Sequence, residues 1–267
     1  MKKGIYNELI NINKAIRLIG EDKNTTIINF NPKVSITQVP ILTVDADNCT
    51  IENLQITLGN RSIIAQGITI KSKNNTIKNT IITNVTNGIE LTAYAESNTI
   101  IHNQITHNLI GINAINSLSN TISYNTLSHN TQYCIYFSSE ADHNTISFNN
   151  LDSSSYGIRI KGSKQNYVYN NCITNNTKDG MYFCCGAREN YFYNNTLINN
   201  TLNANENSGL RNVWYNAQSR LGNYWDDYNG SDENHDDIGD SPYNIPGAGN
   251  QDSYPLMTPP LDIPCNQ

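Results

Sequence analysis

The sequence repeats itself at intervals of 22 to 26 residues over most of its length. The phrase Asn-Thr-Ile, or a close variant, recurs, and it supplies an apolar anchor at positions 27, 51, 77, 100, 122, 146, 168 and 192. Self-similarity at such a period is typical of a solenoid, in which each repeat is one structural unit stacked on the next. This feature excludes most compact folds, because a solenoid repeat contacts only its neighbours.

Each repeat also carries further apolar positions of the same kind. A second anchor follows the first by five residues, and a small-apolar-x-apolar segment such as Gly88-Ile89-Glu90-Leu91 completes the repeat. Alternating β-branched residues interrupted by Asn and Gly are typical of short strands and turns. The chain contains 46 Asn and 35 Ile, whereas leucine-rich repeats of similar period need a Leu framework. We therefore predict an all-β fold, a single-stranded parallel β-helix with coils over 1–202 and an irregular C-terminal cap over 203–267.

Asn residues occupy two fixed positions in these repeats. One position precedes the first anchor by two residues, at Asn75, Asn98, Asn120, Asn144, Asn166 and Asn190. The other follows the anchor by three residues, at Asn103, Asn125, Asn149, Asn171 and Asn195. Asn tolerates left-handed backbone at corners, and stacked amides can hydrogen-bond along a column. We expect these residues to form the scaffold and not a binding site.

Charge and hydropathy exclude several classes of partner. Only 15% of residues are charged and the net charge is -6, so the field of the protein does not favour nucleic acid. No apolar run approaches the ~18 residues of a membrane span. The N-terminal MKKGIYNELININ has no apolar core, so we expect no signal peptide in the chain as given. The strand-like Ile10 to Gly20 segment suggests that the chain starts inside a coil, as part of a longer secreted polypeptide or from a misassigned start.

The C-terminal region differs from the repeats in being aromatic and acidic. Both tryptophans, Trp214 and Trp225, lie there, and we expect them to cover the last coil. Residues 226–240 contain seven acidic residues and no Lys or Arg. Oxygen ligands alternate in this segment as they do in calcium loops, at Asp232, Asn234, Asp236, the Ile238 carbonyl and Asp240. We predict a structural calcium that fixes the cap; the alternative is a plain solvated turn, because no bidentate Glu occupies the twelfth position.

The outward column of the third strand in each repeat offers the candidate ligand-binding residues. Tyr136, Arg159 and Tyr182 occupy equivalent positions in consecutive repeats, and Lys161 lies in the neighbouring column. Aromatic rings and cations together suit a sugar carboxylate. If the protein is catalytic, Arg159 and Lys161 are the candidates, although no pair of carboxylates accompanies them as glycoside hydrolysis requires. The alternative is that these are ordinary exterior residues of a solvated sheet.

The six cysteines show no metal-binding spacing. They lie at positions 49, 134, 172, 184, 185 and 265, and none forms a C-x-x-C motif. We expect scattered structural cysteines without a metal site. The adjacent pair Cys184 and Cys185 leaves open a vicinal disulfide or a thiol metal ligand.

Several of these motifs together resemble a known family. The coil phrase Asn74-Asn75-Thr76-Ile77, the Gly-Ile-x-Ile segments and the C-terminal Gly222-Asn223-Tyr224-Trp225 resemble the NosD-like right-handed parallel β-helix proteins, common in archaeal surface proteins and related to carbohydrate-binding and sugar-hydrolase β-helices. The resemblance implies a right-handed helix at the cell surface or outside the cell. The family name also implies copper-site maturation. Copper favours clusters of Met, His or Cys, and with 3 Met and 5 His we do not expect copper here.

Taken with the resemblance, these features predict a non-catalytic module that binds a polysaccharide or cell-envelope glycan, or that forms part of an envelope. We expect it to be monomeric or part of a larger surface polypeptide. The alternative is a polysaccharide-active enzyme, namely a uronate lyase, an epimerase or a glycoside hydrolase. A NosD-type role in copper assembly ranks third, and all three rest on analogy at the level of the fold.

Overall fold

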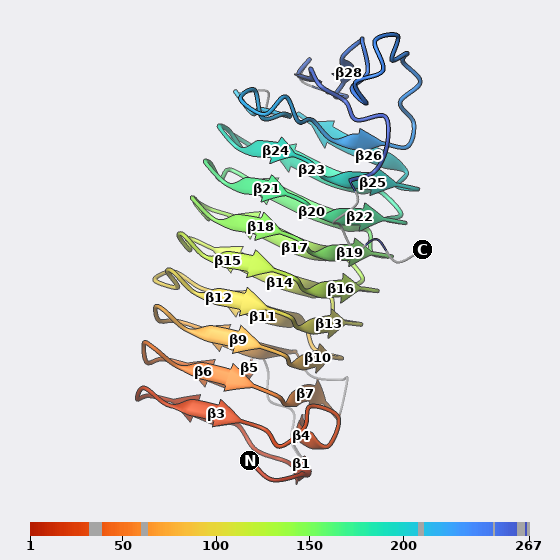
Figure 1. The fold of residues 1–267 in the computed structure, drawn as a ribbon. Helices are drawn as coiled ribbons and strands as arrows, with labels where there is room; N and C mark the ends of the chain where they lie inside the picture. Colours follow the sequence, from red (N-terminus) through yellow and green to blue (C-terminus); the bar gives the residue numbers. More distant parts are fainter. Residues whose placement is uncertain (32–38, 60–63, 208–210, 248, 261–264, 266–267) are drawn as a thin grey trace.

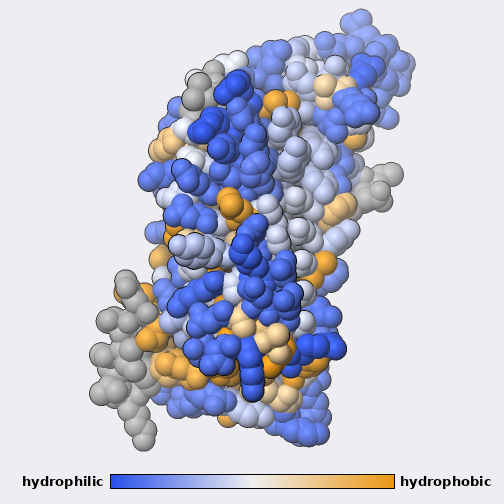
Figure 2. Space-filling model, turned by 90° about the vertical axis from the view of Figure 1, so that its left-hand side faces the viewer, coloured by the Kyte–Doolittle hydropathy of each residue, from blue (hydrophilic) through white to orange (hydrophobic). Residues whose placement is uncertain are grey.

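The computed structural model describes residues 1–31, 39–59, 64–207, 211–247, 249–260 and 265. The chain winds into a right-handed parallel β-helix whose coils stack from the N-terminus to an irregular C-terminal cap (Figure 1). The described residues contain no helix, and so none that could cross a membrane. The predicted fold class is confirmed. The side of the molecule in Figure 2 is mainly hydrophilic, with hydrophobic residues in small groups.

Three parallel sheets run the length of the solenoid, and each coil contributes one strand to each. Sheet A consists of β1 (Gly4–Tyr6), β4 (Thr26–Phe30), β7 (Gln55–Leu58), β10 (Ile81–Thr83), β13 (Gln104–Thr106), β16 (Thr126–Ser128), β19 (Asn150–Asp152), β22 (Cys172–Thr174), β25 (Thr196–Ile198) and β27 (Tyr224–Trp225). Sheet B consists of β2 (Ile10–Ile12), β5 (Val39–Val44), β8 (Ala65–Ile70), β11 (Asn87–Leu91), β14 (Ile110–Ile115), β17 (Tyr133–Ser138), β20 (Tyr156–Lys161), β23 (Asp179–Cys184) and β26 (Leu202–Glu206). Sheet C consists of β3 (Arg17–Ile19), β6 (Thr50–Glu52), β9 (Thr76–Lys78), β12 (Thr99–Ile101), β15 (Thr121–Ser123), β18 (Thr145–Ser147), β21 (Tyr167–Tyr169) and β24 (Tyr191–Tyr193). A short antiparallel pair in the cap, β28 (Tyr243–Asn244) and β29 (Gln251–Asp252), completes the strands.

The apolar anchors form straight columns inside the helix. Ile77, Ile100 and Ile122 pair in register in sheet C and are completely buried. Burial of each such side chain contributes about 1.5–3 kcal/mol relative to exposure. The anchor predicted at Ile27 is wrong, because Leu18 is the residue that pairs with Ile51 in sheet C. Ile27 lies in β4 of sheet A, where the next residue, Ile28, points into the core.

The Asn columns form continuous amide ladders along the solenoid axis, as predicted. In the ladder before sheet C, each side-chain Nδ2 donates to the Oδ1 of the next coil at 3.0–3.2 Å, and the sequence of donors and acceptors is Asn75, Asn98, Asn120, Asn144, Asn166, Asn190 and Asn212. A second ladder precedes sheet A, with distances of 2.9–3.0 Å through Asn103, Asn125, Asn149, Asn171, Asn195 and Asn223. The backbone N–H of each Asn also donates to the next Oδ1, for example Asn98 N to Asn120 Oδ1 at 2.9 Å. The ladders therefore satisfy the polar groups that the tight corners bury.

Both ladders end at a buried carboxylate at the C-terminal end of the solenoid, Glu206 in β26 and Asp252 in the cap. Glu206 accepts from Asn212 Nδ2 at 2.5 Å and from the indole N–H of Trp214 at 3.0 Å. Asp252 accepts from Asn223 N at 2.6 Å and from the indole N–H of Trp225 at 3.0 Å. Because every bond between ladder amides runs toward the C-terminal end, the last Asn of each ladder has no further amide to accept from it. An anionic acceptor completes the series better than a neutral one.

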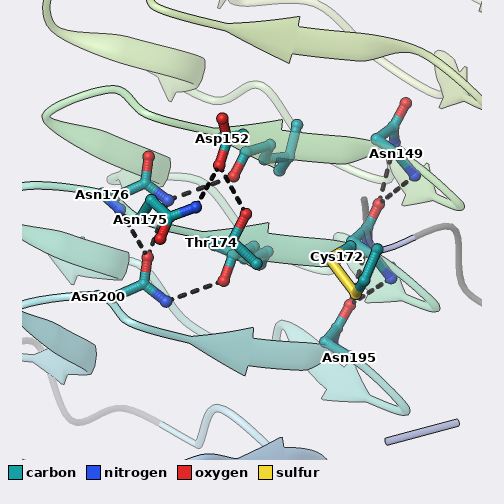
Figure 3. The surroundings of a disulfide bond; sticks show 12 residues. Asn149, Asp152, Cys172, Thr174, Asn175, Asn176, Asn195 and Asn200 are labelled. Atoms are coloured by element: carbon teal, nitrogen blue, oxygen red, sulfur yellow. Dashed lines mark hydrogen bonds between the residues drawn. A yellow bond between two sulfur atoms is a disulfide. The ribbon is translucent and has the colours of Figure 1, made fainter. Parts of the chain in front are cut away.

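A disulfide returns the end of the chain to the side of the solenoid. Cys172 in β22 is bonded to Cys265, 93 residues later, with 5.2 Å between the Cα atoms. Figure 3 shows that the bond lies beside the second amide ladder, next to Asn149 and Asn195. The disulfide covalently joins Cys265, near the C-terminus, to the coil that contains β22.

The ladder analysis predicts the effect of removing one amide from its middle. Asn149 accepts from Asn125 N and donates to Ile122 O and Asn171 Oδ1, all within 3.0 Å. Asn149→Ala leaves these buried groups unpaired, and we expect it to lower the free energy of unfolding by about 2–4 kcal/mol. Urea titration measures this. The exposed Asn229→Ala is the matched control and should change stability by less than about 0.5 kcal/mol; equal effects would contradict the role of the ladder.

The buried Asp252 predicts an unusual pH dependence of stability. Burial raises the pKa of Asp252 to about 6, although N–H donors from Asn223, Tyr254 and Trp225 oppose the shift. Between the ordinary pKa near 3.8 and this value, the folded state binds a proton that the unfolded state has released, so stability falls as the pH rises through this window. We expect wild type to lose about 2 kcal/mol relative to Asp252→Asn between pH 4 and pH 7. Urea titrations at each pH measure the difference, and parallel profiles for the two proteins would contradict it.

Candidate functional site

The candidate site lies on the outward face of sheet B, where β17, β20 and β23 are adjacent. Tyr136, Arg159 and Tyr182 pair in register across these strands and form one outward column, as the repeat spacing predicts. Lys161 lies two residues beyond Arg159, in register with Cys184. Successive residues of a column in a parallel sheet are about 4.8 Å apart, so their side chains contact one another.

Arg159 is surrounded by aromatic rings. Its guanidinium carbon lies 5.5 Å, 5.7 Å and 5.2 Å from the ring centroids of Tyr133, Tyr136 and Tyr182. Arg159 Nη1 also donates to Tyr133 Oη at 2.6 Å. Each cation–π contact contributes about 0.5–2 kcal/mol, depending on how far the cation is desolvated. Together these contacts hold the guanidinium in one orientation.

The charge of Arg159 has no acidic partner among the described residues. No salt bridge in that part of the chain involves Arg159, and its buried Nε has no hydrogen-bond acceptor. Burial opposes its charge, but hydrogen bonds to Cys184 and Tyr133 outweigh this effect, and the pKa of Arg159 lies above its usual value. The patch therefore contains a permanent cation with unused hydrogen-bonding capacity.

Two residues of this patch were not found by sequence reasoning. Tyr133 stacks on Tyr136 with 4.9 Å between ring centroids, and Tyr156 contacts both Tyr133 and Tyr182. The signal was present in the spacing, because Tyr133 and Tyr156 are paired in register. We use "Arg159 patch" below for Tyr133, Tyr136, Tyr156, Arg159 and Tyr182.

Besides Arg159, this face carries three further ionisable groups of interest, Lys161, Asp179 and Tyr182. Lys161 is exposed and contributes to no salt bridge among the described residues. Burial raises the pKa of Asp179, the one acidic residue of the three strands. Burial also raises the pKa of Tyr182, whose hydroxyl accepts from Asn207 Nδ2 at 2.9 Å. At neutral pH Tyr182 therefore presents a neutral phenol beside the Arg159 cation.

The acidic loop of the cap lies apart from this face and folds on itself. Asp232 Oδ1 and Asn234 Oδ1 both accept from Asp236 N, and Asp236 Oδ1 accepts from Ile238 N at 3.1 Å. Asp240 Oδ2 accepts from Glu233 N at 2.8 Å. The bonds from Asp236 N to Asn234 and from Ile238 N to Asp236 are Asx turns, which order a loop through its own backbone. Calcium binding by this loop stays a prediction, and these hydrogen bonds would have to rearrange for it.

The residues suited to copper are dispersed over the described part of the chain. No three His, Cys, Asp or Glu side chains gather there as metal ligands. His107 and His129 stack at 5.2 Å, and Cys184 and Cys185 lie beside a guanidinium, which repels a metal cation. This arrangement does not fit a copper site, and we derive no copper chemistry from it.

Comparisons with known proteins place the chain in a family and identify its fold. The model of a family described as "Periplasmic copper-binding protein (NosD)" matches residues 5–230. The Dettilon tailspike protein (gp208) is similar in structure, with a TM-score of 0.54, 14% identity, and coverage of 81% of this chain and 54% of the tailspike chain. The Azotobacter vinelandii mannuronan C-5 epimerase AlgE6 A-module gives a TM-score of 0.53 and 14% identity, with coverage of 80% of this chain and 70% of the module. No curated protein matches the sequence. At these identities the two structures share the fold alone, and this chain spans about half the length of the tailspike.

Melting with a chelator tests the calcium prediction. If an ion fixes the cap, EDTA should lower the Tm by about 2–4 °C for each kcal/mol of binding free energy that is lost. Asp236→Asn should remove the EDTA effect, because it removes one predicted ligand. An identical Tm with calcium and with EDTA would contradict the prediction and leave the Asx turns as the source of order.

Proposed function

The chain belongs to the NosD family, and on that premise we propose that its sheet B face binds an acidic polysaccharide outside the cytoplasm without cleaving it. The observation that carries the proposal is the unpaired charge of Arg159 among three tyrosine rings. Such a cation needs an anionic partner, and a carboxylate accepts two parallel N–H bonds from a guanidinium. A uronate residue supplies that carboxylate.

The rings of the Arg159 patch suit the remainder of such a ligand. Tyr side chains offer large apolar surface together with a hydroxyl, a combination that contacts both the faces and the hydroxyls of sugars. The surface of a parallel β-helix is long and repetitive, and it therefore accommodates an extended chain along the axis. The epimerase module is named for an activity on the same fold, and this chain shares only the fold with that module and with the tailspike.

The acidic residues of the face argue for binding and against glycoside hydrolysis. Hydrolysis of a glycosidic bond requires two carboxyl groups about 5–9.5 Å apart. The strands β17, β20 and β23 contain a single acidic residue, Asp179. This supports the proposed binding role over glycoside hydrolysis.

One contact favours a second candidate function, that of a uronate lyase or epimerase. Both reactions begin with removal of the proton next to the uronate carboxylate, which requires a base within hydrogen-bonding reach. Tyr133 Oη lies 2.6 Å from Arg159 Nη1, so a phenol is held beside the predicted carboxylate position. In this alternative Tyr133 exchanges the proton, and Arg159 stabilises the charge that develops on the carboxylate.

Removal of the Arg159 guanidinium tests the binding proposal. We expect Arg159→Ala to weaken binding of polygalacturonate or alginate oligosaccharides roughly 10- to 100-fold, because a charge-assisted hydrogen-bonded pair contributes about 1.5–3 kcal/mol. Isothermal titration calorimetry measures the loss, and neutral dextran should not bind. Arg17→Ala in the first coil is the matched control, since that exposed arginine lies 3.7 Å from Glu52 at the opposite end of the molecule. Equal affinities for wild type and Arg159→Ala would contradict the proposal.

Turnover separates the two candidate functions. For a binding module we expect no unsaturated uronate in the ultraviolet absorbance and no change of epimer composition by proton NMR. If either product forms, Tyr133→Phe distinguishes the roles, because it removes the phenolic proton and leaves the aromatic ring. Product lost in Tyr133→Phe with affinity retained would establish the enzyme and overturn the non-catalytic proposal.

A further inference from the structure

The adjacent cysteines at the end of β23 occupy a turn beside the Arg159 patch. Cys184 Sγ and Cys185 Sγ lie 2.8 Å apart, and Cys184 Sγ is 3.9 Å from Arg159 Nη2. Cys184 is buried, whereas Cys185 is exposed. Ala187 N donates to Cys184 O at 3.2 Å, and Cys185 and Gly186 have φ of 61° and 88°. Two consecutive left-handed residues within this hydrogen bond define a tight turn of the mirror-image type.

Cys185 has left-handed backbone at a corner where the three preceding coils carry residues other than cysteine. The equivalent corners of the three preceding coils are Asn116, Ser139 and Gly162, with φ of 49°, 52° and 66°. Gly and Asn adopt left-handed backbone readily, whereas other residues do so at a cost of about 1–2 kcal/mol. The backbone conformation therefore gives no reason for a cysteine at this corner. The short distance from its sulfur to Cys184 Sγ gives one.

We propose that Cys184 and Cys185 form a vicinal disulfide in the mature protein, which makes this turn a redox modification site at the rim of the Arg159 patch. The structure already contains a long-range disulfide, Cys172–Cys265, and such bonds form and persist in oxidising compartments. An oxidising compartment would also oxidise the exposed Cys185 thiol, whose sulfur is in contact with that of Cys184. The other free cysteines, Cys49 and Cys134, are both buried.

The chemistry is an ordinary thiol–disulfide exchange with a small-molecule or protein disulfide as oxidant. The exposed Cys185 thiolate attacks the external disulfide, forms a mixed disulfide and releases one thiol. Cys184 then loses its proton to water and displaces the second thiol, so that the Sγ–Sγ bond closes. The two cysteines lose two protons and two electrons, and the external disulfide is reduced to two thiols. Burial raises the pKa of Cys184, which makes Cys185 the attacking residue and Cys184 the resolving one.

Peptide mass spectrometry tests the proposal directly. Trypsin releases Asp179–Arg188, which contains both cysteines and no others. The folded protein is first incubated with oxidised glutathione, then denatured and alkylated with iodoacetamide without reductant. We expect this peptide to carry no alkyl group and to be lighter than the dithiol by two hydrogen atoms. After reduction it should accept two alkyl groups.

Two internal references make either result decisive. The linked peptides of Cys172 and Cys265 report that the sample was oxidised, and Cys185→Ser should yield a peptide with one alkyl group on Cys184. Two alkyl groups on the wild-type peptide while Cys172–Cys265 remains linked would overturn the proposal. A stable glutathione adduct on Cys185 would also overturn it, because Cys184 would then have failed to resolve the mixed disulfide. Neither result depends on whether the Arg159 patch binds a polysaccharide.

Discussion

The hydrogen bond from one asparagine amide to the next is the interaction on which this solenoid depends. Each coil turns corners where several backbone groups leave the sheets and are buried, and such groups cost about 1–3 kcal/mol each when unpaired. The Asn side chain offers two donors and one acceptor in a short, planar group, so it can serve its own coil and the next at once. Asn125 shows this, since its Nδ2 donates both to Ile100 O and to Asn149 Oδ1. The ladders thus fix the register of the coils and also provide hydrogen-bond partners for the buried backbone groups at the corners.

The direction of the ladders explains the chemistry of the cap. The bonds between ladder amides all run toward the C-terminal end, so the first acceptor and the last donor of each ladder need partners from outside the repeat. At the N-terminal end Asn75 Oδ1 accepts from Cys49 N at 2.8 Å. At the other end Glu206 and Asp252 accept from the last Asn of each ladder and from one tryptophan indole each. The tryptophans therefore cover the last coil with apolar surface while their N–H groups help to keep two buried carboxylates hydrogen-bonded.

Much of this architecture could be predicted from the sequence, because in a solenoid the repeat spacing is itself the register. The ladder positions and the column of Tyr136, Arg159 and Tyr182 followed from spacing alone. The spacing also pairs Tyr133 with Tyr156, but it does not predict that they join this outward face, because the strand alternation breaks where Cys134 and Ile135 are both buried in succession. The Cys172–Cys265 pair could not be predicted either, since the pairing of cysteines 93 residues apart cannot be deduced from their spacing.

The ladders and the Arg159 patch differ in whether their polar groups have hydrogen-bond partners within the protein. Inside the corners, the amides of successive coils satisfy one another in unbroken series. On the outward face of sheet B, the same stacking brings together a cation and three tyrosines and leaves Arg159 Nε without an acceptor. A scaffold held by its corners leaves its outward columns free to vary, since those side chains contribute little to closing the coil. An uncompensated charge on such a column costs stability, and the proposed acidic ligand would supply the missing acceptor.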